Sequence, residues 1–162
     1  MKPKNRIYVH YRANKFDSTK VYNPYWNDTK PYGLWASATT SNYPWKEWVE
    51  DNDFHIAHLS KHFNFKLASG TKILVIRKEK DILPYIKPWE ETMYYKMYGI
   101  DRTKMMGCCT SMNDELDLHT IMKKFDGMEL LISNNYNMRW GIFHLWDCDS
   151  ICIWNLDKVI PL

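Results

Sequence analysis

Several features that often reveal a protein's function are missing from this chain of 162 residues. Nowhere do about 18 apolar residues follow one another, so the sequence predicts no membrane-spanning helix. The first residues, MKPKNRIYVHYR, lack an apolar segment long enough for a signal peptide, and we therefore expect a cytoplasmic protein. No repeat, low-complexity tract or flexible linker occurs, which favours a single domain over residues 1–162.

The chain also has no large excess of positive or negative charge, because 22 basic residues are nearly balanced by 19 acidic ones and the net charge is only +3. The basic residues are scattered, so the charge neither requires nor excludes a nucleic-acid partner. No C-x-x-C spacing occurs among Cys108, Cys109, Cys148 and Cys152. We expect reduced thiols rather than disulfides, and no metal bound by these cysteines.

Aromatic residues are the unusual feature of the composition. They make up 15% of a chain whose apolar share of 45% and charged share of 25% are ordinary for a globular protein. Residues 30–48, KPYGLWASATTSNYPWKEW, hold three of the eight tryptophans around a Gly-Leu-Trp-Ala-Ser turn. Aromatic side chains in such a place form either a core or the floor of a binding site.

Apolar periodicity and turn residues predict an α+β protein with a curved, largely antiparallel sheet of six or seven strands and three or four helices. Residues 63–67 and 72–76 read as a hairpin or a pair of neighbouring strands across a Ser-Gly turn. The expected strands cover 7–11, 34–38, 63–67, 72–76, 128–132, 141–146 and 151–154, and the expected helices cover 45–51, 80–86, 89–97 and 114–125.

Three histidines, His55, His58 and His62, lie at spacings that could place them near one metal ion on a helix. The segment HIAHLSKH lacks the glutamate of a zinc protease, and His62 begins a predicted strand. Surface or loop histidines are therefore the favoured interpretation, with a metal site or a substrate contact as alternatives.

Three acidic residues could contribute to a site. In WDCDS, Asp147 and Asp149 would share a face in a strand or cap a turn, and the turn is favoured because a strand follows directly. Paired carboxylates could also hold magnesium or divide acid and base roles. Glu129 lies among apolar residues, so it must either face solvent at a sheet edge or lie in a cleft beside a hydrogen-bonding partner.

The order of these segments resembles the ADP-ribosyltransferase superfamily, a group of NAD-consuming enzymes with a split, mostly antiparallel sheet. His10 with Tyr11 is similar to the opening motif, GLWAS over 33–37 is similar to the second, and Glu129 is similar to the glutamate of the third. KILVIRKEKDIL is similar to the intervening strand and helix. The segments GLW-x-S, FDG and WDCDS-x-x-I-W-N are also similar to parts of small bacteriophage proteins.

The sequence departs from the family pattern at two places. The first motif usually has a glycine beside its His or Arg, but Tyr11 and Arg12 follow His10, and Arg12 is an alternative for the motif residue. Arginine-directed members often carry Gln or Glu two positions before the third-motif glutamate, where this chain has Gly127. The resemblance therefore leaves the acceptor open.

The resemblance implies a catalytic set of His10, Ser37 and Glu129. His10 would hydrogen-bond the nicotinamide ribose, and Ser37 would help to orient that ribose. Glu129 would stabilise the positive charge that develops as nicotinamide leaves. No metal is required. The residues implied for binding NAD, which is the substrate here, are Tyr11, Arg12, Gly33, Trp35, Tyr43 and Trp45.

The implied activity is transfer of ADP-ribose to a macromolecular acceptor, either a host protein or a nucleic acid, in the cytoplasm of the host if the chain is viral. A second hypothesis is a phage inhibitor without catalysis that binds a host protein or a nucleotide signal, because exposed aromatic and Met residues suit interfaces. A nucleic-acid-binding module is a third, weaker hypothesis because the charges are scattered.

Overall fold

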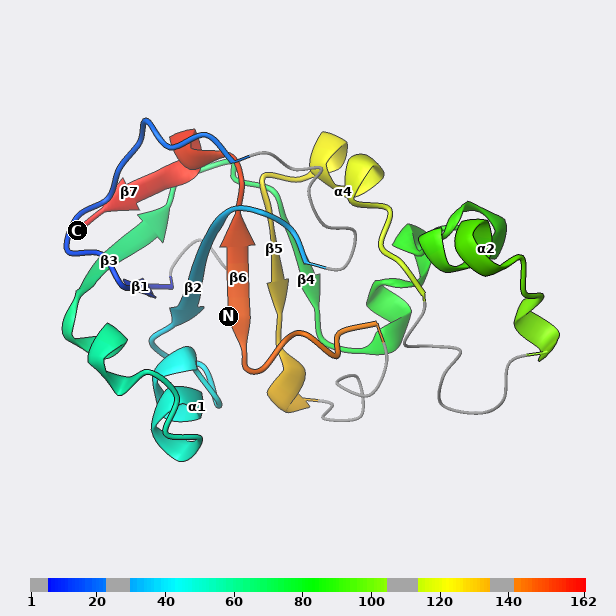
Figure 1. Ribbon diagram of the computed structural model, residues 1–162. Coiled ribbons are helices and arrows are strands. Elements are labelled where there is room, and N and C mark those ends of the chain that lie inside the picture. The colour runs from blue at the N-terminus through cyan, green and yellow to red at the C-terminus, as the bar shows by residue number, and fades with distance from the viewer. Residues whose placement is uncertain (1–5, 23–29, 105–113, 135–141) are drawn as a thin grey trace.

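A seven-stranded sheet organises the computed structural model, which describes residues 6–22, 30–104, 114–134 and 142–162 (Figure 1). Within these ranges the fold is α+β, as the sequence predicted. The strands are β1 (Tyr8–Tyr11), β2 (Leu34–Ala38), β3 (His62–Leu67), β4 (Ile73–Ile76), β5 (Gly127–Leu130), β6 (Ser150–Ile153) and β7 (Val159–Pro161), and the α-helices are α1 (Trp45–Asp51), α2 (Met93–Tyr98) and α4 (Leu118–Lys124).

The spatial order of the strands is β4-β5-β6-β2-β1-β3-β7, and every neighbouring pair is antiparallel except β4 with β5. β1 and β2 are held together by only two residue pairs, Tyr8 with Ala38 and Val9 with Ser37. Beyond these pairs β1 continues along β3, while β2 continues along β6. The two halves of the sheet therefore diverge between β1 and β2.

Two hydrophobic cores lie on opposite faces of the sheet, because alternate residues of a strand point to opposite sides. One core includes Tyr8 and Phe65 and covers the face that also carries Ile151. The other includes Met128 and Trp146 and is covered by α4. Both faces of the central strands are thus buried, which explains the nearly continuous apolar runs there.

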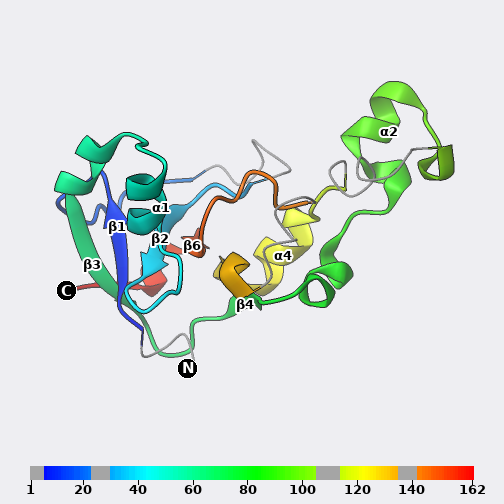
Figure 2. The ribbon, with the colours of Figure 1, turned by 90° about the horizontal axis from the view of Figure 1, so that it is seen from below.

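The segment around α2 extends away from the sheet, as Figure 2 shows most clearly. Two ion pairs tie this segment to the residues before α4: Lys87 to Glu115 at 3.0 Å and Arg102 to Asp114 at 2.9 Å. The carboxylates of both pairs are largely buried. On α2 itself, Met97 and Tyr98 are strongly exposed.

Several expected elements differ in the structure. The segments 63–67 and 72–76 form no hairpin, because β3 pairs with β1 and β7 whereas β4 runs parallel to β5. The strand expected over 141–146 is wrong for residues 142–146, which form a turn whose Phe143 and Trp146 are buried. The helix expected over 80–86 is two short 3₁₀ turns, and α2 and α4 are shorter than expected. The last strand, β7, was not anticipated.

Candidate functional site

A cleft of about 520 Å³ opens where β1 and β2 diverge. The ends of both strands form its floor, α1 contributes a tryptophan, and the turn before β6 contributes polar groups. The lining residues are Val9, His10, Tyr11, Arg12, Ala13, Lys20, Tyr22, Lys30, Gly33, Trp35, Ala36, Ser37, Trp45, Asp147, Cys148 and Ser150.

The His10 ring bridges the gap between the two strands. Its Nδ1 lies 2.7 Å from the backbone oxygen of Trp35. A carbonyl oxygen only accepts hydrogen bonds, so Nδ1 donates and Nε2 of the neutral ring is an acceptor. Burial lowers the pKa of His10 below its ordinary value, which the bond to Trp35 opposes in part. The ring is therefore neutral near pH 7 and can accept a hydroxyl hydrogen at Nε2.

Ser37 connects β2 to the start of α1. Its hydroxyl donates to the backbone oxygen of Asp149 at 2.8 Å and accepts the backbone N–H of Trp45 at 2.9 Å. The second bond satisfies an N–H that the first turn of α1 leaves without a partner in the helix. Pro44 occupies the cap position and has no side-chain acceptor for this N–H. Ser37 thus positions the Trp45 wall of the cleft.

Aromatic rings and cations both line the cleft. The Lys30 ammonium lies 4.6 Å from the centroid of the Trp35 ring and donates to the backbone oxygen of Leu145 at 3.0 Å. The Trp35 ring packs edge-on against Trp146, with centroids 4.6 Å apart. Arg12 and Lys20 add two further cations to the lining. This combination suits a ligand with flat rings and anionic groups, such as a nucleotide.

Glu129 is outside the lining of this cleft. It is 1% exposed on β5, the second strand from one edge of the sheet, and its Oε1 accepts from Arg6 at 2.7 Å and from Tyr8 at 3.3 Å. Its Oε2 is buried and has no partner among the described residues. Burial raises the pKa of Glu129, and the charge of Arg6 and the hydrogen bonds oppose that rise. Glu129 therefore does not face solvent at a sheet edge: it is buried beside a hydrogen-bonding partner, but it does not line the cleft.

Two glycines are required by close backbone contacts. A Cβ on Gly33 would lie 2.5 Å from the backbone oxygen of Ile153, and a Cβ on Gly127 would lie 2.7 Å from that of Cys152. These distances are too short for any side chain. The Gln or Glu of arginine-directed family members therefore cannot replace Gly127 unless the backbone shifts.

The acidic residues of WDCDS have different surroundings. Asp147 lines the cleft. Asp149 is 2% exposed and accepts from Ser133 through both carboxylate oxygens, at 2.8 Å from the backbone N and 2.6 Å from the hydroxyl. Asp149 therefore holds the end of β5 against the turn before β6 instead of facing a ligand.

The structure brings together most of the site residues that the sequence predicted. Seven of them line the cleft: His10, Tyr11, Arg12, Gly33, Trp35, Ser37 and Trp45. Glu129 does not, and neither does Tyr43, whose hydroxyl lies 3.3 Å from a carboxylate oxygen of Asp51. Lys20, Tyr22 and Lys30 were missed, because they come from polar loops that carry no local motif.

The histidines of HIAHLSKH lie apart from the cleft. The rings of His55 and His58 are 5.0 Å apart, while His62 is in β3 beside the ring of Tyr11. Among residues 6–22, 30–104, 114–134 and 142–162, no group of three or more His, Cys, Asp or Glu could hold a metal ion. Cys108 and Cys109 lie outside the described residues, and Cys148 and Cys152 are buried free thiols.

No family model matches the sequence, and no curated protein or solved structure matches it either. No helix in the described part of the chain is long and apolar enough to cross a membrane.

Proposed function

We propose that this protein is an NAD-dependent ADP-ribosyltransferase-like enzyme. The observation that carries the proposal is the cleft between β1 and β2, where seven residues named by the resemblance meet although they come from separate parts of the sequence. The divergence of β1 from β2 is also in keeping with the split sheet of that superfamily.

The chemical groups of the cleft fit the parts of NAD. Trp35 and Trp45 offer faces for the adenine or nicotinamide ring, and Arg12, Lys20 and Lys30 offer positive charge to the diphosphate. Nε2 of the neutral His10 accepts a ribose hydroxyl. Ser37 keeps Trp45 in place through its bond to the first turn of α1.

The reaction breaks the bond between C1′ of the ribose and the nicotinamide nitrogen. The electron pair leaves with neutral nicotinamide, positive charge develops at C1′, and the acceptor's nucleophile bonds to C1′ and releases a proton. A cleft walled by aromatic side chains excludes water and strengthens the fixed dipoles around that charge.

A carboxylate is needed near the developing charge, and two residues compete for this role. Glu129 is the residue that the resemblance implies, but it must exchange Arg6 and Tyr8 for the substrate. Asp147 already lines the cleft. The variants Glu129→Gln and Asp147→Asn distinguish them, because only loss of the working carboxylate lowers nicotinamide release while NAD binding persists.

The proposal is tested by measuring NAD binding and nicotinamide release with purified protein and its His10→Ala variant. The control is His119→Ala, because His119 is an exposed residue of α4 outside the cleft. We expect the His10 variant to lose most of its NAD affinity while the His119 variant keeps it. Absence of NAD binding by the wild-type protein would reject the proposal.

A second candidate function is favoured by the position of Glu129. The cleft has cations and aromatic faces, but the carboxylate that the resemblance implies lies outside it and is bound to Arg6 and Tyr8, so the cleft could hold a nucleotide signal without cleaving it. Binding of a host protein by the exposed Met and Tyr residues of α2 would serve the same inhibitory role. Tight NAD binding without nicotinamide release would favour this function over the enzyme.

We also propose that the protein acts in the cytoplasm, the host's cytoplasm if the chain is viral. The buried free thiols of Cys148 and Cys152 support a reducing compartment. Recovery of these thiols in reduced form from cells, by alkylation and mass spectrometry, tests this placement.

A further inference from the structure

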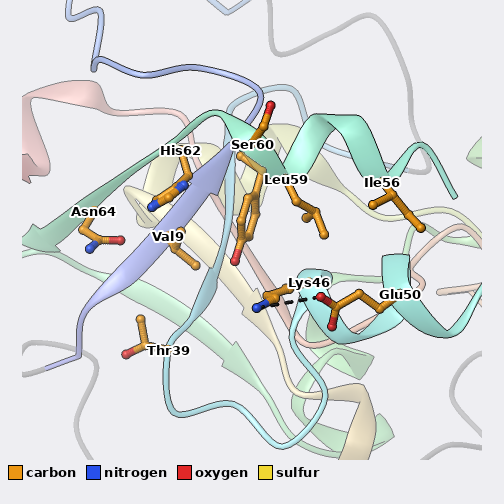
Figure 3. Close-up of a pocket in the computed structure, with 10 residues that line it drawn as sticks. Val9, Thr39, Lys46, Glu50, Ile56, Leu59, Ser60, His62 and Asn64 are labelled. Atoms are coloured by element: carbon orange, nitrogen blue, oxygen red, sulfur yellow. Dashed lines mark ion pairs between the residues drawn. The ribbon is translucent and has the colours of Figure 1, made fainter. Parts of the chain in front are cut away.

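We propose that a groove beside the NAD cleft binds the acceptor, and that the acceptor is a basic, extended segment of a protein rather than a nucleic acid. The role as acceptor site rests on the proposed function. The groove, of about 590 Å³, is called the β1–β3 groove (Figure 3). Its lining is Val9, Tyr11, Thr39, Lys46, Glu50, Ile56, Leu59, Ser60, His62 and Asn64.

The position of the groove suits an acceptor. Val9 and Tyr11 of β1 line both the groove and the NAD cleft, so a ligand in one is next to a ligand in the other. The floor consists of alternate residues of β1 and β3, with α1 on one side and the 3₁₀ turn Ile56–Ser60 on the other (Figure 3). A nucleophile lying in the groove would approach the ribose from outside the cleft.

The shape and polarity of the groove suit an extended peptide. Its apolar part comes from Val9, Leu59 and Ile56, and Ile56 is 49% exposed although it is apolar. The amide group of Asn64 lies on the floor strand β3 and can hydrogen-bond a peptide backbone, whereas the Ser60 hydroxyl, on the 3₁₀ turn, already donates to the backbone oxygen of Ala57 at 2.8 Å. Such a mixture fits alternating side chains, of which every second one faces the floor.

Charge identifies the kind of peptide. The segment WKEWVEDND, residues 45–53, carries four exposed carboxylates against one exposed lysine, and of these five side chains Glu50 and Lys46 line the groove itself. Within the groove Glu50 is 3.7 Å from Lys46, and both side chains are more than half exposed, so this pair is weak and a cation of the acceptor can replace Lys46. Phosphate groups of a nucleic acid would be repelled by the same carboxylates.

The test compares charge reversals at two positions of α1. Binding of a fluorescein-labelled decapeptide alternating leucine and arginine is measured by anisotropy, without NAD, at about 50 mM salt so that screening stays weak. Glu50→Lys reverses the charge inside the groove, and Glu47→Lys reverses it on the same helix outside the groove. Glu50→Gln, which only removes the charge, is the milder second variant.

We expect Glu50→Lys to weaken peptide binding about ten-fold and Glu50→Gln about three-fold, with Glu47→Lys close to wild type. Equal losses of peptide affinity in the two lysine variants would reject the groove as the peptide site, because the overall charge of α1 would then account for the binding. Tighter binding of a single-stranded oligonucleotide than of the peptide would also overturn it. Nicotinamide release is measured separately without peptide, so failure of the NAD proposal is distinguishable from failure of the groove.

Discussion

His10 and Glu129 project from the same face of one sheet, yet their surroundings differ in kind. Glu129 pairs with Ile151, and Ile151 pairs with Ala36. Extending the pairing of β1 with β2 by one residue places His10 opposite Ala36, so all four side chains are on the same face. His10 is fixed by a backbone oxygen, which leaves one ring nitrogen for a ligand. Glu129 is fixed by the side chains of Arg6 and Tyr8.

The difference teaches that burial alone does not make a polar residue part of a site. His10 is only partly buried, lines the cleft and bonds to the backbone through Nδ1, so Nε2 remains an acceptor. A buried group that forms an ion pair stabilises the fold through that pair, and removing either partner leaves an uncompensated charge.

The largest effect is expected for Arg6→Met. This variant leaves the buried Glu129 without its cation, and breaking a buried ion pair costs about 3–5 kcal/mol of unfolding free energy. Urea unfolding at pH 7 measures the loss. Lys46→Met is the control, because the exposed pair of Lys46 with Glu50 contributes at most about 1 kcal/mol. Equal losses in the two variants would contradict the structural role of the Arg6 pair.

The loss in Arg6→Met should shrink in acid. The folded-state pKa of Glu129 is already raised above its ordinary value, and removing Arg6 raises it further. Because the folded state then binds the proton more tightly than the unfolded chain, stability falls as pH rises from the unfolded pKa through the folded one. Unfolding at pH 4.5 should therefore show a smaller difference from wild type than at pH 7. A difference that grows in acid would be the opposite result.

Gly33→Ala should have the next largest effect. The added Cβ meets the backbone oxygen of Ile153, which cannot move without separating β2 from β6, and such overpacking costs about 1–3 kcal/mol. NAD affinity should fall as well, because Gly33 lines the cleft. Thermal unfolding and isothermal titration measure the two effects. A variant as stable as wild type would show that β2 and β6 leave room for a Cβ at position 33.

Ser37→Ala tests whether the Ser37 hydroxyl only positions Trp45 or also takes part in the chemical step. Loss of its bonds to Trp45 and Asp149 should cost about 1–2 kcal/mol of stability. If Ser37 only positions Trp45, the KM of the folded variant for NAD should rise more than its kcat for nicotinamide release falls. A loss confined to kcat would instead assign Ser37 to the chemical step.

The smallest effect is expected from the pH dependence of His10. Its folded-state pKa is lowered, so the stability it contributes is present above its ordinary pKa of 6.5 and is lost as pH falls through the folded value. Protonation also removes the acceptor at Nε2, so NAD binding should be constant above pH 6.5 and weaken below it. Titrating binding in wild type and in Ser37→Ala, which keeps His10, should give the same midpoint.

Local pattern predicted the elements that form the cleft. Alternating large residues predict β1, Gly33 marks the start of β2, and Pro44 marks the start of α1. The predicted residue ranges closely match the structure. The tryptophans of residues 30–48, for which the sequence left a core or a binding floor open, divide between two roles. Trp35 and Trp45 line the cleft, whereas Trp48 stacks on Trp45 at 4.9 Å between ring centroids.

Long-range pairing could not be predicted. The bond of Glu129 to Arg6 spans 123 positions in the sequence, and no local signal marks either residue as the other's partner. The parallel pairing of β4 with β5 is equally remote. The apolar residues of 142–146 belong to a turn rather than a strand, because the backbone N–H of Trp146 donates to the backbone oxygen of Phe143 at 2.8 Å. The two buried side chains, Phe143 and Trp146, are three positions apart, a spacing that a turn allows and an alternating strand does not.

The most direct test of the account is isothermal titration of the wild-type protein with NAD, followed in the same samples by an assay for released nicotinamide. We expect NAD binding that His10→Ala largely removes and His119→Ala preserves, together with release of nicotinamide. A protein that folds normally and gives no heat of binding with NAD would contradict the assignment of the cleft between β1 and β2.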